Sequence, residues 1–164
     1  MVCSKILGNV SNVHTDKTMN CVSVEWFETD KKILRKVLDN GQEVGIRCDK
    51  KLEDGDILFE DDKSMIVIRV APCDLISTSV RSMREMGRLC FELGNRHLTL
   101  AISDDNVKCP YDAPTLAYLQ KLGFSSEKVH ERFDDYIECK AHGHSHDHEH
   151  SDGSDHCHPH HHHE

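Results

Sequence analysis

The stretch SVRSMREMGRLCFELGNRH, residues 79–97, decides the fold of the second half of the chain. Its apolar residues recur at 3-4-3 spacing, at Met83, Met86, Cys90 and Leu93. That spacing predicts a helix with one apolar face. Ser79 can cap the start of this helix, and Gly94 is expected to end it as a left-handed C-cap glycine. His97 then follows the helix at the start of the next strand.

Strand and turn signals on both sides of this helix predict one βαββαβ unit. The expected strands are Asp74–Thr78, Leu98–Ile102, Val107–Cys109 and Lys128–Phe133. Asp112 caps a second helix, which Gly123 ends. The apolar stripe of that helix consists of Leu116, Leu119 and Leu122. This order of elements is the split βαβ arrangement, and it predicts a ferredoxin-like domain over residues 73–138.

The first part of the chain, residues 1–72, has the pattern of a small all-β domain. Short apolar runs alternate with turn signals, and Asp39-Asn40-Gly41 is a strong hairpin signal. The expected strands are Ser4–Val10, Cys21–Trp26, Ile33–Leu38, Glu43–Arg47, Ile57–Phe59 and Met65–Ala71. Strands of this length predict a barrel or a sandwich. With a boundary near Ala71-Pro72, the fold class is α+β with two domains.

The C-terminal tail, residues 139–164, holds eleven of the fourteen histidines. From Ala141 to Glu164 it has no Leu, Ile, Val, Phe or Met, so it cannot build a core and is expected to be disordered. Imidazole suits Ni²⁺, Cu²⁺ and Zn²⁺. A tail of this kind offers many similar sites, which suits capture or transfer of a metal. The candidate ligands in it are His142, His144, His146, His148, His150, His156, Cys157 and His158.

A purification tag is the alternative explanation of the tail. The run His160–His163 would fit a tag. The alternation of histidine with Gly, Ser, Asp and Glu in residues 142–150 does not resemble one, nor does His156-Cys157-His158. The metal-binding interpretation is therefore preferred.

Composition excludes several classes of function. The net charge of −9 and the pI of about 5.8 give no electrostatic footprint for nucleic acid or for an anionic membrane. No signal peptide and no membrane span is apparent, so a cytoplasmic protein is expected. The eight cysteines form no CxxC pair, and most are expected to be buried apolar residues in a reducing compartment. Cys139, close to the tail, is a second candidate thiol ligand after Cys157.

His97 is the candidate ligand in the folded region. It follows the C-terminus of a helix, whose partial negative charge favours a cation. One imidazole is too few for a tight site, but a two-fold dimer would bring two copies together across its axis. The alternative is that His97 is a structural cap or a hydrogen-bonded surface residue.

Residues 86–97, MGRLCFELGNRH, resemble the signature of the UreE family, the urease accessory proteins that carry nickel. The resemblance covers essentially the whole chain, from the β-rich first half to the histidine-rich tail. It implies a first domain that binds a peptide or partner and a ferredoxin-like second domain that dimerises head to head. It also implies a nickel ion shared by His97 of two protomers, with tail histidines completing the coordination. The implied partners are the accessory GTPase of the pathway and urease apoprotein.

One region departs from the pattern of that family. Some members carry extra histidines in the loop before the second helix, whereas residues 109–113 read CPYDA. Cys109 could substitute as a ligand there, but a buried thiol is the preferred interpretation.

These residues leave three functions to compare. The first is a nickel metallochaperone for urease maturation that works by ligand exchange, and Zn²⁺ or Cu²⁺ could also bind it in vitro. The second is a nickel or zinc storage or buffering protein that acts mainly through its tail. The third, a metal-dependent hydrolase, lacks a fixed ligand set, because the only folded-region histidines besides His97 are His14 and His130. Those two are expected to be solvated or hydrogen-bonded, and no enzyme activity is predicted.

Overall fold

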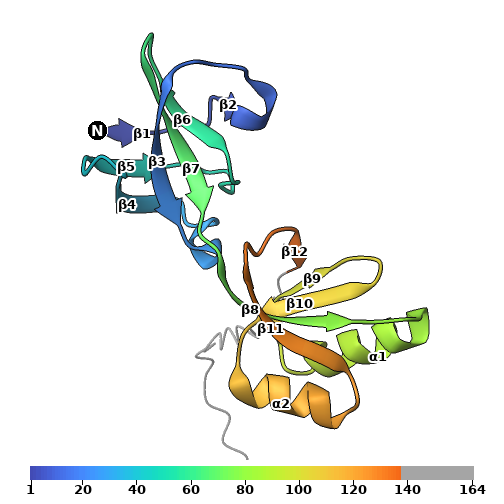
Figure 1. Ribbon diagram of the computed structural model, residues 1–164. Coiled ribbons are helices and arrows are strands. Elements are labelled where there is room, and N and C mark those ends of the chain that lie inside the picture. Colours follow the sequence, from blue (N-terminus) through green and yellow to red (C-terminus); the bar gives the residue numbers. More distant parts are fainter. Residues whose placement is uncertain (138–164) are drawn as a thin grey trace, which may run out of the picture.

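The structure, a computed structural model, describes residues 1–137 and is mostly strand, with two α-helices in its second half (Figure 1). The predicted metal-binding tail, residues 139–164, lies outside the described residues with all its candidate ligands. Along residues 1–137 no helix is long and apolar enough to cross a membrane. The strands before Ala71 form two sheets, and those after Pro72 form a third.

The two sheets before Ala71 share one apolar core. The four-stranded sheet has the order β2-β6-β7-β3, and the three-stranded sheet has the order β1-β5-β4. Buried side chains from both sheets, such as Val22 and Ile46, belong to one apolar cluster. Neither sheet closes on itself. The elements are β1 (Val2–Cys3), β2 (Gly8–Asn9), β3 (Thr18–Val24), β4 (Ile33–Val37), β5 (Glu43–Arg47), β6 (Asp56–Glu60) and β7 (Ser64–Val70), with short 3-10 helices at Val10–Asn12 and Trp26–Glu28.

Most of the expected strands of this half are present within a residue or two, and the hairpin prediction is confirmed. β4 and β5 pair antiparallel around Gly41, whose φ of 85° requires glycine. The continuous strand expected at Ser4–Val10 is wrong. The chain changes sheets there, because β1 pairs with β5 and β2 pairs with β6. Trp26 is also not in a strand but opens a 3-10 helix after β3.

The second half is one antiparallel sheet of order β11-β8-β10-β9-β12, with both helices on the same face (Figure 1). Residues from both helices pack with Ile76, Val107 and Cys109 of the sheet in one core. The last strand starts and ends earlier than expected, and a further strand follows it. The elements are β8 (Cys73–Ser79), α1 (Met83–Gly94), β9 (Leu100–Ile102), β10 (Asn106–Pro110), α2 (Ala113–Lys121), β11 (Ser125–Glu131) and β12 (Tyr136–Ile137).

Both predicted helices are present, but α1 starts later than expected. Ser82, not Ser79, caps α1, and its hydroxyl accepts a hydrogen bond from the Glu85 amide at 3.2 Å. Ser79 is the last residue of β8. Met83 is 86% exposed, whereas Leu89 is fully buried, so the apolar face includes Leu89 and excludes Met83. For α2 the Asp112 cap is confirmed, since its carboxylate accepts from the Thr115 amide at 3.0 Å.

Candidate metal centre

His97 occupies the left-handed position at the end of α1. Its φ is 55°, a conformation that non-glycine residues rarely adopt. The Leu98 amide donates to the Leu93 carbonyl at 3.4 Å, and the His97 amide donates to the Gly94 carbonyl at 2.9 Å. These two bonds define a Schellman motif, in which the left-handed residue is usually glycine. The expectation that Gly94 takes this role is therefore wrong, and His97 takes it instead.

The end of α2 shows the same motif with its usual residue. The Phe124 amide donates to the Leu119 carbonyl at 3.1 Å, and the Gly123 amide donates to the Gln120 carbonyl at 3.0 Å. Gly123 has a φ of 87°. The two helices of the sheet thus end alike, except that one end carries glycine and the other carries an imidazole. The conformation at His97 costs free energy that glycine would not cost.

Contacts of Tyr118 in α2 with Arg96 and Glu92 support the turn that carries His97. The Arg96 guanidinium lies over the Tyr118 ring, 4.1 Å from its centroid. The Tyr118 hydroxyl donates to the Glu92 carboxylate at 2.5 Å, and this bond raises the pKa of Tyr118. The sequence does not predict these contacts, because no local pattern links residues of two helices that meet only in the folded chain.

His97 is exposed, at the carboxyl end of a helix. The last carbonyls of a helix carry partial negative charge, which stabilises a cation beside them. The site therefore has a hydrogen-bonded backbone turn, an exposed imidazole and a favourable local field. Within residues 1–137 no group of three or more His, Cys, Asp and Glu side chains could hold a metal ion. Further ligands would have to come from the tail or from another molecule.

The outer face of α1 next to this site is apolar and open. Met83 is 86% exposed and Phe91 is 66% exposed. Gly87 and Gly94 lie between and beyond them at helical spacing, and a Cβ added at either would meet nothing within 4 Å. A flat apolar stripe therefore leads along the helix toward His97.

The other folded-region candidates are not brought to this site. His14 is exposed in a loop that follows a 3-10 helix. The Nδ1 atom of His130 lies 2.8 Å from the Asp74 carboxylate, so the expected hydrogen-bonded state of His130 is confirmed. Cys109 is 1% exposed, and burial raises its pKa to about 11, which confirms the preferred interpretation of a buried thiol. The six cysteines of residues 1–137 are all free.

Comparison with known proteins identifies relatives over both halves of the chain. Residues 3–71 match the family described as the N-terminal domain of UreE urease accessory protein, and residues 72–163 match its C-terminal domain. A urease accessory protein UreE of Bifidobacterium longum subsp. infantis is 44% identical over 87% of this chain, a match that spans 65% of that relative's length. One of Acetivibrio thermocellus is 38% identical over 87% of this chain and 95% of its own length. A urease accessory protein UreE of Flavobacterium johnsoniae is 36% identical over 84% of this chain and 86% of its own length.

Proposed function

This chain belongs to the UreE family of urease accessory proteins, and on that premise we propose that it carries Ni²⁺ to urease during maturation. Membership makes it an accessory chaperone of urease maturation and not an enzyme. The finer statement, nickel delivery by ligand exchange, is the proposal. The observation that carries it is His97, an exposed imidazole at a left-handed helix end where glycine is the usual residue.

The proposed mechanism is stepwise exchange of ligands. Tail histidines capture Ni²⁺ and raise its concentration near His97, since tethering makes the second binding event intramolecular. His97 from each of two protomers then holds the ion, with tail residues completing the coordination. Because the tail ligands can leave one at a time, an acceptor protein can take the metal without a single large barrier. The tail ligands proposed are His142, His144, His146, His148, His150, His156, Cys157 and His158.

A homodimer is part of this proposal. The exposed stripe of Met83 and Phe91 on α1 would be covered by its own copy across a two-fold axis, which is the usual form of a symmetric interface. His97 lies at the end of the same helix, so that axis would bring two imidazoles together. The antiparallel strand order β11-β8-β10-β9 supports a ferredoxin-like assignment for residues 73–138.

The remaining parts of the proposal come from the resemblance. Residues 1–72 would bind a partner or peptide, residues 73–138 would bind metal and dimerise, and residues 139–164 would load the metal. The partners would be the accessory GTPase and, through the larger complex, urease apoprotein, all in the cytoplasm. A storage or buffering role is the second candidate, favoured by the tail, with eleven of the fourteen histidines. A storage role gives no reason for the left-handed backbone conformation of His97.

A calorimetric nickel titration tests the proposal with four forms of the chain. These are the intact chain, a truncation after Lys140, His97→Ala, and His130→Ala as a matched control histidine paired with Asp74. We expect one tight site per dimer that survives truncation and His130→Ala but is lost with His97→Ala. If all binding leaves with the tail and His97→Ala changes nothing, the protein is a buffer.

A further inference from the structure

The segment between β11 and β12 crosses the whole second sheet. β11 lies at one edge of this sheet and β12 at the other, with β8, β10 and β9 between them. The segment Arg132–Ile137, here called the strap, joins these two edges of the sheet.

Aromatic contacts hold the strap against the first domain. Phe133 is 1% exposed, and its ring meets the Trp26 ring edge-on, with 5.0 Å between centroids. The Tyr136 ring stacks on Phe133 and also meets Trp26 edge-on, at 5.4 Å. The Tyr136 hydroxyl lies 3.0 Å from the Trp26 carbonyl and 2.9 Å from the Thr29 hydroxyl. Phe133 and Tyr136 of the strap are thus held by contacts with Trp26 and Thr29 of the first domain.

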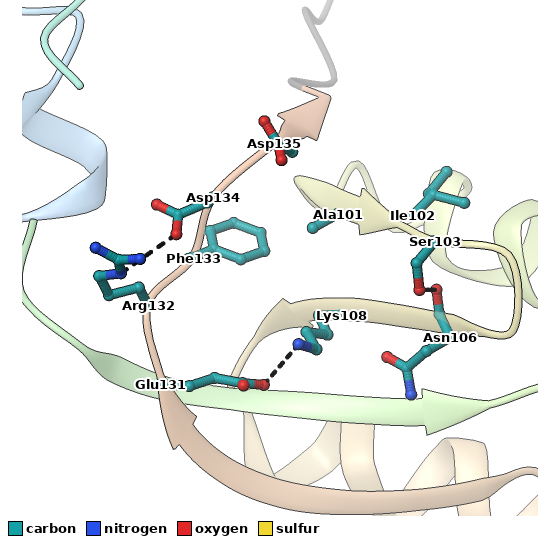
Figure 2. Close-up of a pocket in the computed structure, with 10 residues that line it drawn as sticks. All are labelled: Ala101, Ile102, Ser103, Asn106, Lys108, Glu131, Arg132, Phe133, Asp134 and Asp135. Atoms are coloured by element: carbon teal, nitrogen blue, oxygen red, sulfur yellow. Dashed lines mark hydrogen bonds and ion pairs between the residues drawn. The ribbon is translucent and has the colours of Figure 1, made fainter. Parts of the chain in front are cut away.

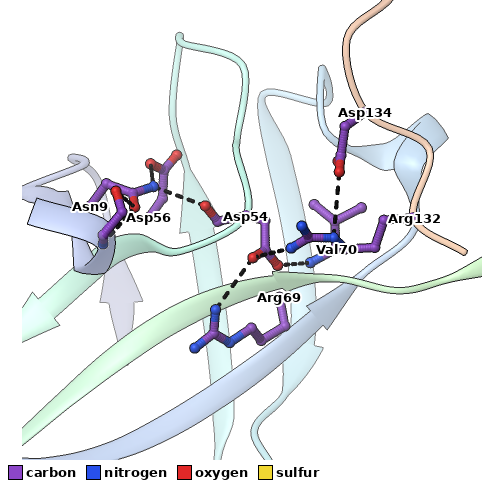
Figure 3. Close-up of polar contacts among 8 residues, drawn as sticks. Asn9, Asp54, Asp56, Arg69, Val70, Arg132 and Asp134 are labelled. Carbon is purple, nitrogen blue, oxygen red and sulfur yellow. Dashed lines mark hydrogen bonds and ion pairs between the residues drawn. The ribbon is translucent and has the colours of Figure 1, made fainter. Parts of the chain in front are cut away.

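An ion pair adds a third attachment (Figure 3). The Arg132 guanidinium donates to Oδ2 of Asp54 at 2.5 Å and also lies 3.4 Å from the Asp134 carboxylate. Asp54 is itself held by the first domain, because it accepts from the Val70 amide at 2.9 Å and from Arg69 at 3.3 Å. Arg132 therefore attaches to a carboxylate that is already positioned.

The rest of the strap is loosely packed. A cavity of about 450 Å³ lies between the strap and the β9–β10 hairpin, and its strap side is lined by Arg132, Phe133, Asp134 and Asp135 (Figure 2). A second cavity, of about 720 Å³, lies between the strap and the first domain. Since space remains on both sides, a few side chains do most of the holding.

The strap ends beside the candidate metal centre. β12 pairs antiparallel with β9, with Ile137 opposite Leu100 and Tyr136 opposite Ala101. The chain at Ile137 therefore runs toward the residues that precede Leu100. His97 lies three residues before Leu100, which is about 10 Å along an extended chain. Without the strap, the chain would leave the sheet at Glu131 on the opposite edge.

We propose that the strap is a positioning element for metal transfer: it carries the start of the tail across the sheet and fixes it beside His97. Phe133, Tyr136 and Arg132 are positioning residues, since they act through the tail and touch no metal. The inference rests on the proposed function, in that it requires tail histidines to reach the His97 site. It adds that contacts with the first domain control how readily they do so.

Tether length gives the size of the effect. His142, the first tail histidine, is five residues beyond Ile137 but eleven beyond Glu131. The effective concentration of a tethered ligand falls roughly as the −3/2 power of tether length. Release of the strap should therefore lower the tail's contribution at His97 by about threefold from length alone. The wrong exit edge should lower it further.

Two variants of the full chain separate the exit point from the tether length. The double variant Phe133→Ala, Tyr136→Ala releases the strap, and a six-residue Gly/Ser insertion after Ile137 lengthens the tether to the same eleven residues with the strap intact. Trp26 is the only tryptophan in the chain, so its emission should shift to the red in the double variant and stay unchanged in the insertion. Tyr111→Phe is the control for an aromatic change outside the strap.

The readout is the ratio of the nickel Kd of the chain truncated after Lys140 to that of each full-length form. We expect this ratio to fall about threefold with the insertion, at least as far with the double variant, and not at all with Tyr111→Phe. An unchanged ratio in the insertion variant, or in a double variant whose Trp26 emission has shifted, would overturn the inference. If the double variant does not fold, the insertion still decides. Failure of the proposed function is recognised separately, because nickel binding would then be unaffected by His97→Ala.

Discussion

Replacing His97 by glycine should leave the metal-free protein more stable than replacing it by alanine, and either change should remove the proposed nickel site. His97 has a φ of 55° in the Schellman motif that ends α1. A side chain with a Cβ is unfavourable in this conformation, and glycine is not. His97→Ala keeps a Cβ in this conformation, whereas His97→Gly removes it. The glycine variant should therefore be more stable than the alanine variant.

The size of the effect follows from two opposing terms. The left-handed conformation costs a non-glycine residue about 1–2 kcal/mol. Glycine adds conformational freedom to the unfolded chain, which costs about 0.4–1 kcal/mol. The difference leaves a net stabilisation of about 0.5–1 kcal/mol for His97→Gly over His97→Ala.

Urea unfolding with a metal chelator, followed by circular dichroism at one protein concentration, measures this difference. Gly123→Ala is the internal control, because Gly123 ends α2 in the same motif with a φ of 87° and open space around its Cβ position. That substitution should destabilise by about 1 kcal/mol. If Gly123→Ala behaves so while His97→Gly is no more stable than His97→Ala, then His97 carries no strain and the argument from its conformation is refuted.

Three further predictions concern the strap, a buried thiol and an edge pair. Phe133→Ala should lower the free energy of unfolding by about 3–5 kcal/mol in urea titrations, because its ring is 1% exposed. Burial raises the pKa of Cys109 to about 11, so at pH 8 peptide mapping should find it alkylated only after unfolding. Hydrogen bonding from Lys128 lowers the pKa of Asp74 below its ordinary 3.8. Its stabilising contribution is then present above pH 3.8 and lost as pH falls through the lower folded value, so Asp74→Asn should flatten the acid limb of thermal stability below about pH 4.

Local signals in the sequence predicted the parts of the fold that depend on local chemistry. Gly41 in the β4–β5 hairpin and Asp112 at the start of α2 are such cases, since each acts on its own neighbours. Ser79 and Ser82 are both plausible N-caps of α1. The sequence does not show that Ser79 instead pairs with Asn106 in the β8–β10 ladder. The apolar stripe was shifted for the same reason, because Met83 belongs to the first turn of a helix that starts later than expected.

The sequence singles out His97 as the candidate ligand, but it does not give the geometry around this residue. His97 could be singled out because it follows a helix, yet its left-handed backbone was assigned to Gly94, the residue that usually adopts it. Tyr118 and Glu92 come together only through the packing of α2 on α1, which no spacing encodes. β12 has two residues and no periodicity, so its place beside β9 follows from the strap's contacts with Trp26.

The position of β12 bears on the choice between a chaperone and a buffer. A buffer needs only the tail, and its capacity would not depend on where the tail leaves the fold. In this chain the strap crosses from one edge of the sheet to the other and ends opposite Leu100, three residues from His97. His97 in turn is kept in a conformation that glycine would adopt at lower cost. Both features add constraint at the same sheet edge, and a handover of metal between tail and His97 requires that edge. A tail that only stores metal requires neither.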